Sequence, residues 1–256
     1  MQSASANEVT SFVNRALLRS TDDLSLTARR RIYASFTGTK QEIGVVKLSA
    51  GLPSSSPTSL QTGKALTFYP LSTTWLVLRR FSEVDVGAFL GYRNDPEVIR
   101  YEYWNGCTAA EAAEYIRRQQ SQEAGVPGEW LQIAIALKAT DQLIGDCGVR
   151  IPPADARQAT ISVALARAWH GRGLAAEALS CLFDYLFRQL ALHRVVVDTD
   201  VENTAMQKLA ERLGMRHEAH LKQSLWFKGR WADEYFYAIL REEWLVRNGP
   251  AEGGAP

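Results

Sequence analysis

The sequence has few cysteines, few histidines and almost no net charge. Its three cysteines among 256 residues are widely spaced, and none belongs to a CxxC motif. Such spacing argues against a disulfide framework or a zinc site and favours a reducing compartment such as the cytoplasm. Four histidines without a nearby cysteine give no typical metal-ligand pattern, so we expect no metal.

Charge and hydropathy exclude two classes of partner. Lys and Arg number 29 against 28 Asp and Glu, a formal net charge of +1, whereas nucleic-acid-binding proteins usually carry a basic excess on one face. No apolar run approaches the ~20 residues of a membrane helix. The N-terminus also lacks the apolar core of a secretory signal. We therefore expect neither a nucleic-acid nor a membrane partner.

The chain changes character near residue 70. Residues 1–70 show weak periodicity and contain a Ser- and Pro-rich stretch at 50–64, a composition typical of a linker. Their role stays open between an oligomerisation arm, a flap over the substrate and a disordered extension. Residues 71–246 read as one regular domain, and residues 247–256 as a disordered tail.

Apolar periodicity from Trp75 onward predicts interleaved strands and helices. Ser82 with Asp85, and Thr108 with Glu111, have capping-box spacing, so we expect a helix to begin at each hydroxyl residue. The interleaved order indicates an α/β sheet packed by helices, and the hairpins indicate that the sheet is mixed. The expected strands are 75–80, 130–137, 143–150, 159–166, 193–200 and two within 224–240; the expected helices are 82–95, 108–125, 174–186 and 204–214.

The stretch HGRGLAAEAL, residues 170–179, is the candidate anion site. Gly171 and Gly173 permit close backbone approach to a ligand. The first amides of the following helix lack internal partners, and together with the helix dipole they favour an anion. Arg172 adds a positive charge. The spacing matches neither the P-loop nor the dinucleotide motif, so an ordinary strand-to-helix turn and a diphosphate site both remain open on spacing alone.

The same stretch resembles the acetyl-CoA-binding signature Q/R-x-x-G-x-G/A of the GCN5-related N-acetyltransferase (GNAT) superfamily. His170 stands where Gln or Arg is usual, while Gly173 and Ala175 match. The resemblance covers residues 75–246. Four further stretches resemble the RimJ/RimL-like subgroup, in the family's order: LRRFSEVDVGAFLGYRNDPEV at 78–98, LIGDCGV at 143–149, VENTAMQKLAERLGM at 201–215 and KGRWADEYFYAILREEW at 228–244.

The resemblance implies a GNAT-type mixed, mostly antiparallel sheet flanked by helices. Its fourth and fifth strands splay apart, and the pantetheine arm of acetyl-CoA lies between them against the strand edge at Val163 and Leu165. Asn203 matches a cofactor-binding position, although it also suits a helix N-cap, and the two roles can coexist. The diphosphate is then expected on the loop residues His170, Gly171, Arg172, Gly173, Leu174 and Ala175.

The implied reaction is direct attack of an amine on the thioester, which needs a proton acceptor and a proton donor. The usual donor position holds Met206 instead of Ser, and the usual base position holds Thr160 instead of Glu. Asp198 and Asp200 share one face of the fifth strand, where neighbouring carboxylates could supply a base. The alternative is that both cap the strand end or bind water. Tyr235 is either a phenolic donor or a core residue.

The acceptor is expected at RYEYWNG, residues 100–106. Tyr101, Tyr103 and Trp104 could form an aromatic wall with Glu102 receiving a cationic amine, or the rings could form a small satellite core. The subgroup resemblance favours a protein N-terminal amine as acceptor. The alternatives are a small amine such as an aminoglycoside-type antibiotic, and a non-catalytic acyl-CoA-binding module. A homodimer is compatible with the sequence.

Overall fold

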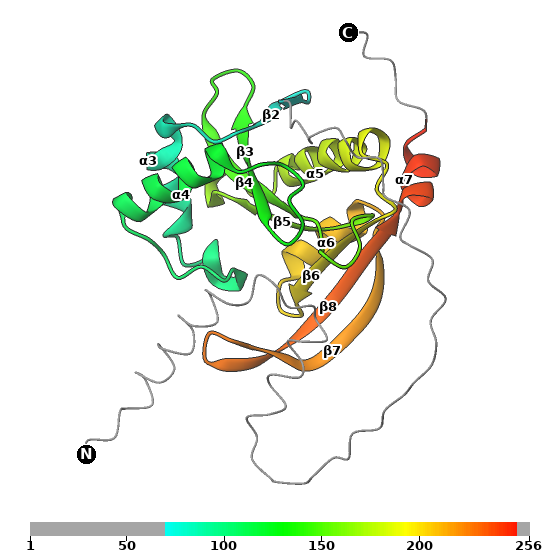
Figure 1. The fold of residues 1–256 in the computed structure, drawn as a ribbon. Coiled ribbons are helices and arrows are strands. Elements are labelled where there is room, and N and C mark those ends of the chain that lie inside the picture. The colour runs from blue at the N-terminus through cyan, green and yellow to red at the C-terminus, as the bar shows by residue number, and fades with distance from the viewer. Residues whose placement is uncertain (1–69, 250–256) are drawn as a thin grey trace, which may run out of the picture. The chain divides into compact units, whose positions relative to one another are not determined.

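The structure is a computed structural model that describes residues 70–249. The expectations for residues 1–69 and for residues 250–256 lie outside this range. The described part contains an eight-stranded sheet of order β1-β2-β3-β4-β5-β6-β8-β7 (Figure 1). The strands are β1 (Leu71–Ser72), β2 (Leu76–Arg79), β3 (Trp130–Leu137), β4 (Leu143–Arg150), β5 (Gln158–Leu165), β6 (Arg194–Asp200), β7 (Arg216–Phe227) and β8 (Arg230–Leu240).

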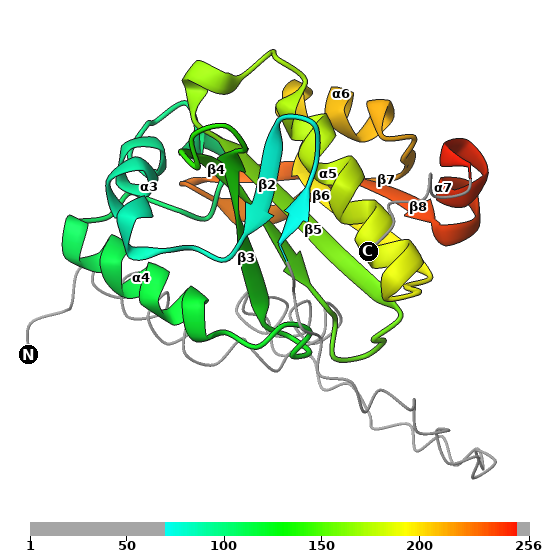
Figure 2. The same ribbon diagram turned by 90° about the horizontal axis from the view of Figure 1, so that it is seen from above.

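Helices cover both faces of this sheet. Figure 2 shows α3 and α4 on one side and α5 and α6 on the other. Each side has its own apolar core, one centred on Phe89 and Ile116 and the other on Leu179 and Phe183. The helices are α3 (Val86–Arg93), α4 (Ala109–Ser121), α5 (Leu174–Asp184) with a π-helical turn at Tyr185–Gln189, α6 (Thr204–Arg212) and α7 (Arg241–Asn248), with 3₁₀ turns at Glu83–Asp85, Ile99–Tyr101 and Arg167–Trp169.

Both predicted capping boxes are present. The Glu111 amide donates to Thr108 Oγ1 at 3.3 Å, and the Thr108 amide donates to Glu111 Oε2 at 2.8 Å. At the other helix start, the Ser82 amide donates to Asp85 Oδ2 at 2.7 Å. These contacts satisfy amides that a helix start leaves unpaired. The helix boundaries expected from Ser82 and Thr108 are therefore confirmed.

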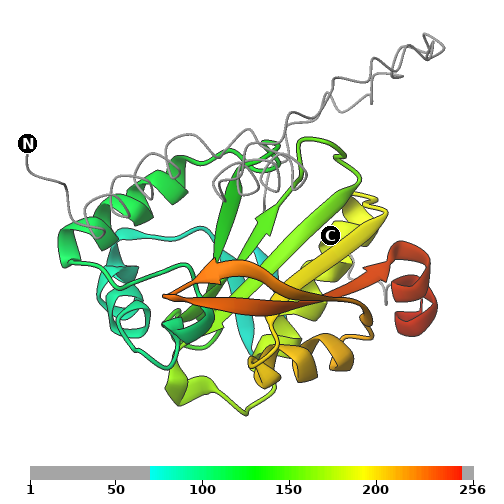
Figure 3. The same cartoon turned by 90° about the horizontal axis from the view of Figure 1, so that it is seen from below.

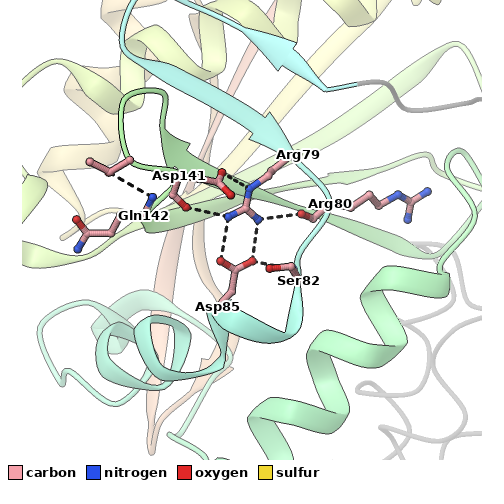
Figure 4. A network of polar contacts seen from close by, with 7 residues as sticks. Arg79, Arg80, Ser82, Asp85, Asp141 and Gln142 are labelled. Atoms are coloured by element: carbon pink, nitrogen blue, oxygen red, sulfur yellow. Dashed lines mark hydrogen bonds and ion pairs between the residues drawn. The ribbon is translucent and has the colours of Figure 1, made fainter.

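Asp85 has a second role that spacing alone did not indicate. It is only 2% exposed, and its two oxygens accept hydrogen bonds from Arg79 at 2.7 and 3.0 Å (Figure 4). Arg79 also donates to Asp141 Oδ1 at 2.7 Å. A planar guanidinium can bind two carboxylates in this way. The network joins the end of β2, the turn before α3 and the β3–β4 turn.

Three boundaries differ from those expected. The helix expected to run to Gly125 ends at Ser121, because Gln122 adopts an extended backbone. The strand β7 begins at Arg216, ahead of the predicted start at residue 224, because its first half is mostly exposed and polar and carries no apolar alternation. The helix α7 was not predicted, and it ends at Asn248, within the range expected to be a tail.

The strands β5 and β6 lie side by side at one end only. Their parallel pairing runs from Gln158↔Arg194 to Thr160↔Val196. Beyond that point, residues 161–165 of β5 pair with β4, and residues 197–200 of β6 pair with β8. This arrangement is the splay expected of the family's fourth and fifth strands. Among the described residues, no helix is long and apolar enough to cross a membrane.

Candidate active site

The opening between β5 and β6 presents the backbone edge of β5. The Ala166 amide donates to the Ile144 carbonyl of β4 at 2.8 Å. Because backbone groups alternate sides along a strand, those of Val163 and Leu165 point into the opening. The Leu165 carbonyl is already used, since His170 Nε2 donates to it at 2.7 Å. The Leu165 amide and both backbone groups of Val163 therefore remain oriented toward a ligand in the opening.

The loop before α5 has the geometry of an anion site. Gly171 and Gly173 adopt φ of 71° and 79°, in the left-handed region that favours glycine. Within the described part of the chain, the amides of residues 171–176 donate to no acceptor. The first helical bond is from the Glu177 amide to the Gly173 carbonyl, at 3.0 Å. Unpaired amides at a helix N-terminus bind anions through hydrogen bonds and the helix dipole.

In the diphosphate loop, the His170 amide is already hydrogen-bonded, and Arg212 is a further candidate for binding an anion. The amide of His170 donates to the Arg167 carbonyl at 3.1 Å, so the free amides begin at Gly171. Arg172 stacks on Trp169, with its guanidinium carbon 4.8 Å from the ring centroid. Arg212, from the last turn of α6, places Nη1 4.0 Å from the position that a Cβ on Gly173 would take. Sequence reasoning missed Arg212 because its nearness depends on how α6 packs beside α5.

Asn203 caps α6, as the alternative interpretation had it. Its Oδ1 accepts a hydrogen bond from the Met206 amide at 3.1 Å. Its Nδ2 has no partner among residues 70–249, so a cofactor contact remains compatible with the cap. Met206 packs against the core beneath α5, and Thr160 sits at the last β5–β6 pair. Neither residue supplies the proton donor or the base that is usual at its position.

Asp198 and Asp200 do lie on one face of β6. Val197 and Thr199 alternate with them and are buried on the side of α5 and α6. Both oxygens of Asp200 accept hydrogen bonds: Oδ1 from the Glu202 amide at 2.8 Å, and Oδ2 from Arg230 at 2.7 Å. The interpretation as a strand-end cap therefore describes Asp200.

Tyr235 lies on the other face of the sheet. It pairs across β6 and β8 with Thr199, and opposed residues on antiparallel strands project to the same side. Its ring contacts those of His217 and His220, at centroid distances of 4.5 and 4.9 Å. The structure therefore does not bring Tyr235 together with Asp198.

The segment expected to hold the acceptor is tied to the β6–α6 turn and to the β7–β8 hairpin. The Tyr101 hydroxyl donates to the Glu202 carbonyl at 3.1 Å, and Lys228 Nζ donates to the Ile99 carbonyl at 2.5 Å. Tyr103 is 73% exposed, with its ring 5.2 Å from that of Phe227. Figure 3 shows the hairpin reaching across the sheet toward this segment. These contacts hold the segment beside the open ends of β6 and β8.

Trp104 belongs to the satellite core rather than to an exposed wall. Its ring packs edge-on against Phe89 at 5.8 Å and against Tyr115 at 5.3 Å. The alternative interpretation therefore holds for Trp104, whereas Tyr103 is exposed.

A buried ionic cluster lies beneath Glu102. Arg93 Nη2 donates to both oxygens of Asp146, at 2.8 and 2.6 Å, and the Tyr92 hydroxyl donates to Oδ1 at 2.6 Å. Asp146 is only 1% exposed. The Glu102 carboxylate lies 3.6 Å from Arg93 Nη1. Burial raises the pKa of Glu102, and the charge of Arg93 opposes that rise. Two carboxylates thus share one guanidinium.

A further carboxylate, Glu234 of β8, shares the face of Asp198 and Asp200. It pairs directly with Asp200 across β6 and β8. Burial raises the pKa of Glu234, a hydrogen bond from Ser224 opposes that rise, and the charges of Asp198 and Asp200 add to it. We call these three residues the carboxylate face. No group of three or more His, Cys, Asp or Glu in the described range is placed to hold a metal ion.

Comparison with known proteins finds a family model that matches more than half of the chain. Residues 76–216 match the family model described as "Acetyltransferase (GNAT) domain". The uncharacterized N-acetyltransferase p20 of Bacillus licheniformis is 32% identical over 175 residues, which cover 68% of this chain and 97% of that protein.

Two relatives have named acceptors and match shorter stretches. The [ribosomal protein uS5]-alanine N-acetyltransferase of Escherichia coli is 29% identical over 33% of this chain and 43% of its own length. The spermidine N(1)-acetyltransferase of Vibrio cholerae is 30% identical over 36% of this chain and 53% of its own length.

Solved structures share the fold. A GNAT-family acetyltransferase from Bacillus anthracis has a TM-score of 0.62 at 24% identity, over 68% of this chain and all (100%) of that one. The Vibrio cholerae spermidine N-acetyltransferase in complex with CoA and spermine has a TM-score of 0.58 at 21% identity, over 68% of this chain and 99% of that one.

Proposed function

Because the chain belongs to the GNAT acetyltransferase family, we propose that it acetylates a primary amine whose carrier bears further positive charge. Acetyl-CoA-dependent acyl transfer follows from the family itself. The acceptor is the new element of the proposal. The observation that carries it is the carboxylate face together with Glu102.

The residues present fit acetyl-CoA as the donor. The free amides of residues 171–176 and the guanidinium groups of Arg172 and Arg212 suit a diphosphate. The edge of Val163 and Leu165 suits the amides of a pantetheine arm, in the manner of an added strand. When bound, the thioester supplies a carbonyl carbon for attack by an amine. The chain's own residues hold and orient both ends of that ligand.

The acceptor would approach from the carboxylate face. The diphosphate loop directly precedes α5, and α5 covers the face of the sheet opposite to the carboxylate face. An amine that reaches the thioester without crossing the donor therefore arrives on the side of Asp198, Glu234 and Glu102. These carboxylates attract an ammonium group, and a second ammonium on the same molecule adds to the attraction.

A protein N-terminal amine is the second candidate. The resemblance of residues 78–98 and 201–215 to the RimJ/RimL-like subgroup supports it, as does the relative that acetylates an alanine of a ribosomal protein. The relative named for spermidine supports a polycation. An aminoglycoside-type antibiotic combines several ammonium groups in a compact molecule, so it belongs to the same charge class as spermine.

An acceptor panel separates these candidates. Release of CoA thiol would be measured with spermine, kanamycin, an alanyl peptide and butylamine, each with acetyl-CoA. We expect kcat/KM for the best polycation to exceed that for butylamine by at least roughly tenfold, a difference of about 1.4 kcal/mol. Glu102→Gln should reduce that advantage, because it should lower kcat/KM for the polycation more than for butylamine. Faster turnover of the alanyl peptide would transfer the assignment to an N-terminal amine.

A further inference from the structure

The position of Glu234 bears on the proton transfer that the reaction needs. The β6–β8 register pairs Asp200 with Glu234 and Asp198 with Phe236. Opposed residues of an antiparallel pair project to the same side. Glu234 therefore faces the side from which the acceptor would approach, and it comes from a different strand than the two aspartates.

Two other carboxylates nearby, Asp200 and Asp233, are committed to structural contacts. Both oxygens of Asp200 accept hydrogen bonds, from the Glu202 amide and from Arg230. Asp233 projects to the opposite face, where its oxygens bind His220 at 2.7 Å and the Gln223 amide at 2.8 Å. An ion-paired or doubly hydrogen-bonded carboxylate accepts a proton poorly, because the contacts stabilise its charged form.

A bulge in β7 orients a single hydrogen bond onto Glu234. The β7–β8 register shifts between Leu221 and Leu225, and Gln223 adopts φ of 46° there. Bulges of this kind re-aim side chains and are common beside active sites. Here the bulge brings the Ser224 hydroxyl to 2.6 Å from Glu234 Oε2. Within residues 70–249, no hydrogen bond reaches Oε1, so this oxygen can contact the amine that receives the acetyl group.

We propose that Glu234 is the general base that takes the proton from the acceptor ammonium. The proposal rests on the transfer of acetyl to an amine described above. The ammonium N–H bond breaks, and the proton moves to the Glu234 carboxylate. The freed lone pair then forms the C–N bond at the thioester carbonyl, and the C–S bond breaks. The nitrogen then loses its second proton, the leaving thiolate takes up one proton, and Glu234 returns the first proton to solvent.

The surroundings of Glu234 suit this task. Asp198 and Asp200 face it from β6, Ser224 contacts it from β7, and the charge of Arg230 is held by Asp200 at 2.7 Å. Burial raises its pKa above the ordinary value of 4.5, the Ser224 hydrogen bond opposes that rise, and the charges of the two aspartates add to it. A carboxylate with a raised pKa accepts a proton more effectively.

The test compares Glu234→Gln with wild type across a pH series, using whichever acceptor of the panel wild type turns over best. We expect kcat/KM at neutral pH to fall about 10²- to 10⁴-fold, the usual range for loss of a general base. The acidic limb that the Glu234 carboxylate gives the wild-type profile should be lost, leaving only a rise toward the pKa of the amine. As pH rises toward the pKa of the amine, the variant should approach wild type, because solution then supplies the free amine.

Three further variants distinguish catalysis from structure. Glu234→Asp should retain the acidic limb at a reduced rate, and Asp200→Asn should move that limb to lower pH by removing one of the charges that raise the base's pKa. Glu218→Gln is the matched control: it removes a β7 carboxylate bound by Arg194 and Arg216, and the limb should stay unchanged. Thermal melting establishes that each variant is folded.

Two outcomes would overturn the base role. One is a Glu234→Gln profile that is lower than wild type by the same factor at every pH and so keeps the wild-type acidic limb. The other is wild type that releases no thiol with any of the four amines, which overturns transfer to amines as well. If wild type prefers the alanyl peptide, the polycation assignment fails, while the pH series with that peptide still decides the role of Glu234.

Discussion

Replacing Gly173 by aspartate tests the diphosphate loop most directly. Its φ of 79° lies in the left-handed region, where Asn and Asp are the best tolerated alternatives to glycine. A Cβ added there meets Arg212 Nη1 at 4.0 Å, an ordinary contact. Gly173→Asp and Gly173→Asn therefore have the same shape and the same backbone strain, and they differ by one charge.

The expected size of the charge effect follows from Coulomb's law. We take roughly 5 Å between the new carboxylate and a diphosphate of about two charges, with an effective dielectric constant of about 40. The repulsion is then about 3 kcal/mol at low salt and about half of that at 0.15 M salt. Relative to the asparagine variant, Kd for acetyl-CoA should rise roughly 200-fold at low salt and roughly 20-fold at 0.15 M salt.

Calorimetric titration of acetyl-CoA into both variants at the two salt concentrations measures this ratio. Both variants should lose similar stability, about 1–2 kcal/mol from the strained backbone, which thermal melting checks. Gly229→Asp is the control, because Gly229 also has a positive φ of 83° with nothing within 4 Å of an added Cβ, but lies in the β7–β8 turn. If the two Gly173 variants bind within threefold of one another at low salt, no diphosphate lies at this loop.

Three other substitutions test the remaining charges. Asp146→Asn should lower the free energy of unfolding by roughly 3–5 kcal/mol, because Arg93 is then buried without its carboxylate; a loss under about 1 kcal/mol in denaturant titrations would contradict this. Glu102→Gln should be more stable than wild type at neutral pH. Burial raises the folded-state pKa of Glu102 above the ordinary value of 4.5, so wild type loses stability as pH rises from 4.5 through the folded-state pKa. The melting temperatures of the two proteins should therefore converge toward acid pH. Arg212→Gln should weaken acetyl-CoA binding about 2- to 5-fold, as for an exposed ion pair, and reduce the salt dependence of Kd; an unchanged salt dependence would exclude Arg212 from the site.

Local signals made most of the fold predictable. The strands β3 and β4 have the bounds expected from their apolar runs, and the Thr108–Glu111 box starts α4 where expected. Such features depend on residues that are close in sequence. The early start of β7 was missed because a polar edge strand is specified by pairing with β8 rather than by its own hydrophobic pattern.

The site was predictable only where one element determines it. Period-two alternation placed Asp198 and Asp200 on one face of β6, and the loop glycines pointed to the anion site. Glu234 could not be predicted from the sequence, because its position depends on the β6–β8 register and its Ser224 contact depends on a bulge in β7. Tyr235 was grouped with the aspartates, since residues alone do not indicate which face of β8 meets them.

The carboxylate face also constrains which residue can serve as the base. Its charges attract an ammonium acceptor, but they also stabilise the ammonium form, which cannot attack, by about 1.36 kcal/mol for each pKa unit. A base away from the carboxylate face, such as Glu218 with its pKa lowered by Arg194, gains no such rise in pKa. The whole stabilisation of the ammonium then opposes proton transfer to that base. At Glu234 the charges of Asp198 and Asp200 raise the pKa of the ammonium and the pKa of the base together. Much of the penalty therefore cancels. The electrostatics that would select a cationic amine therefore require a base drawn from the same face.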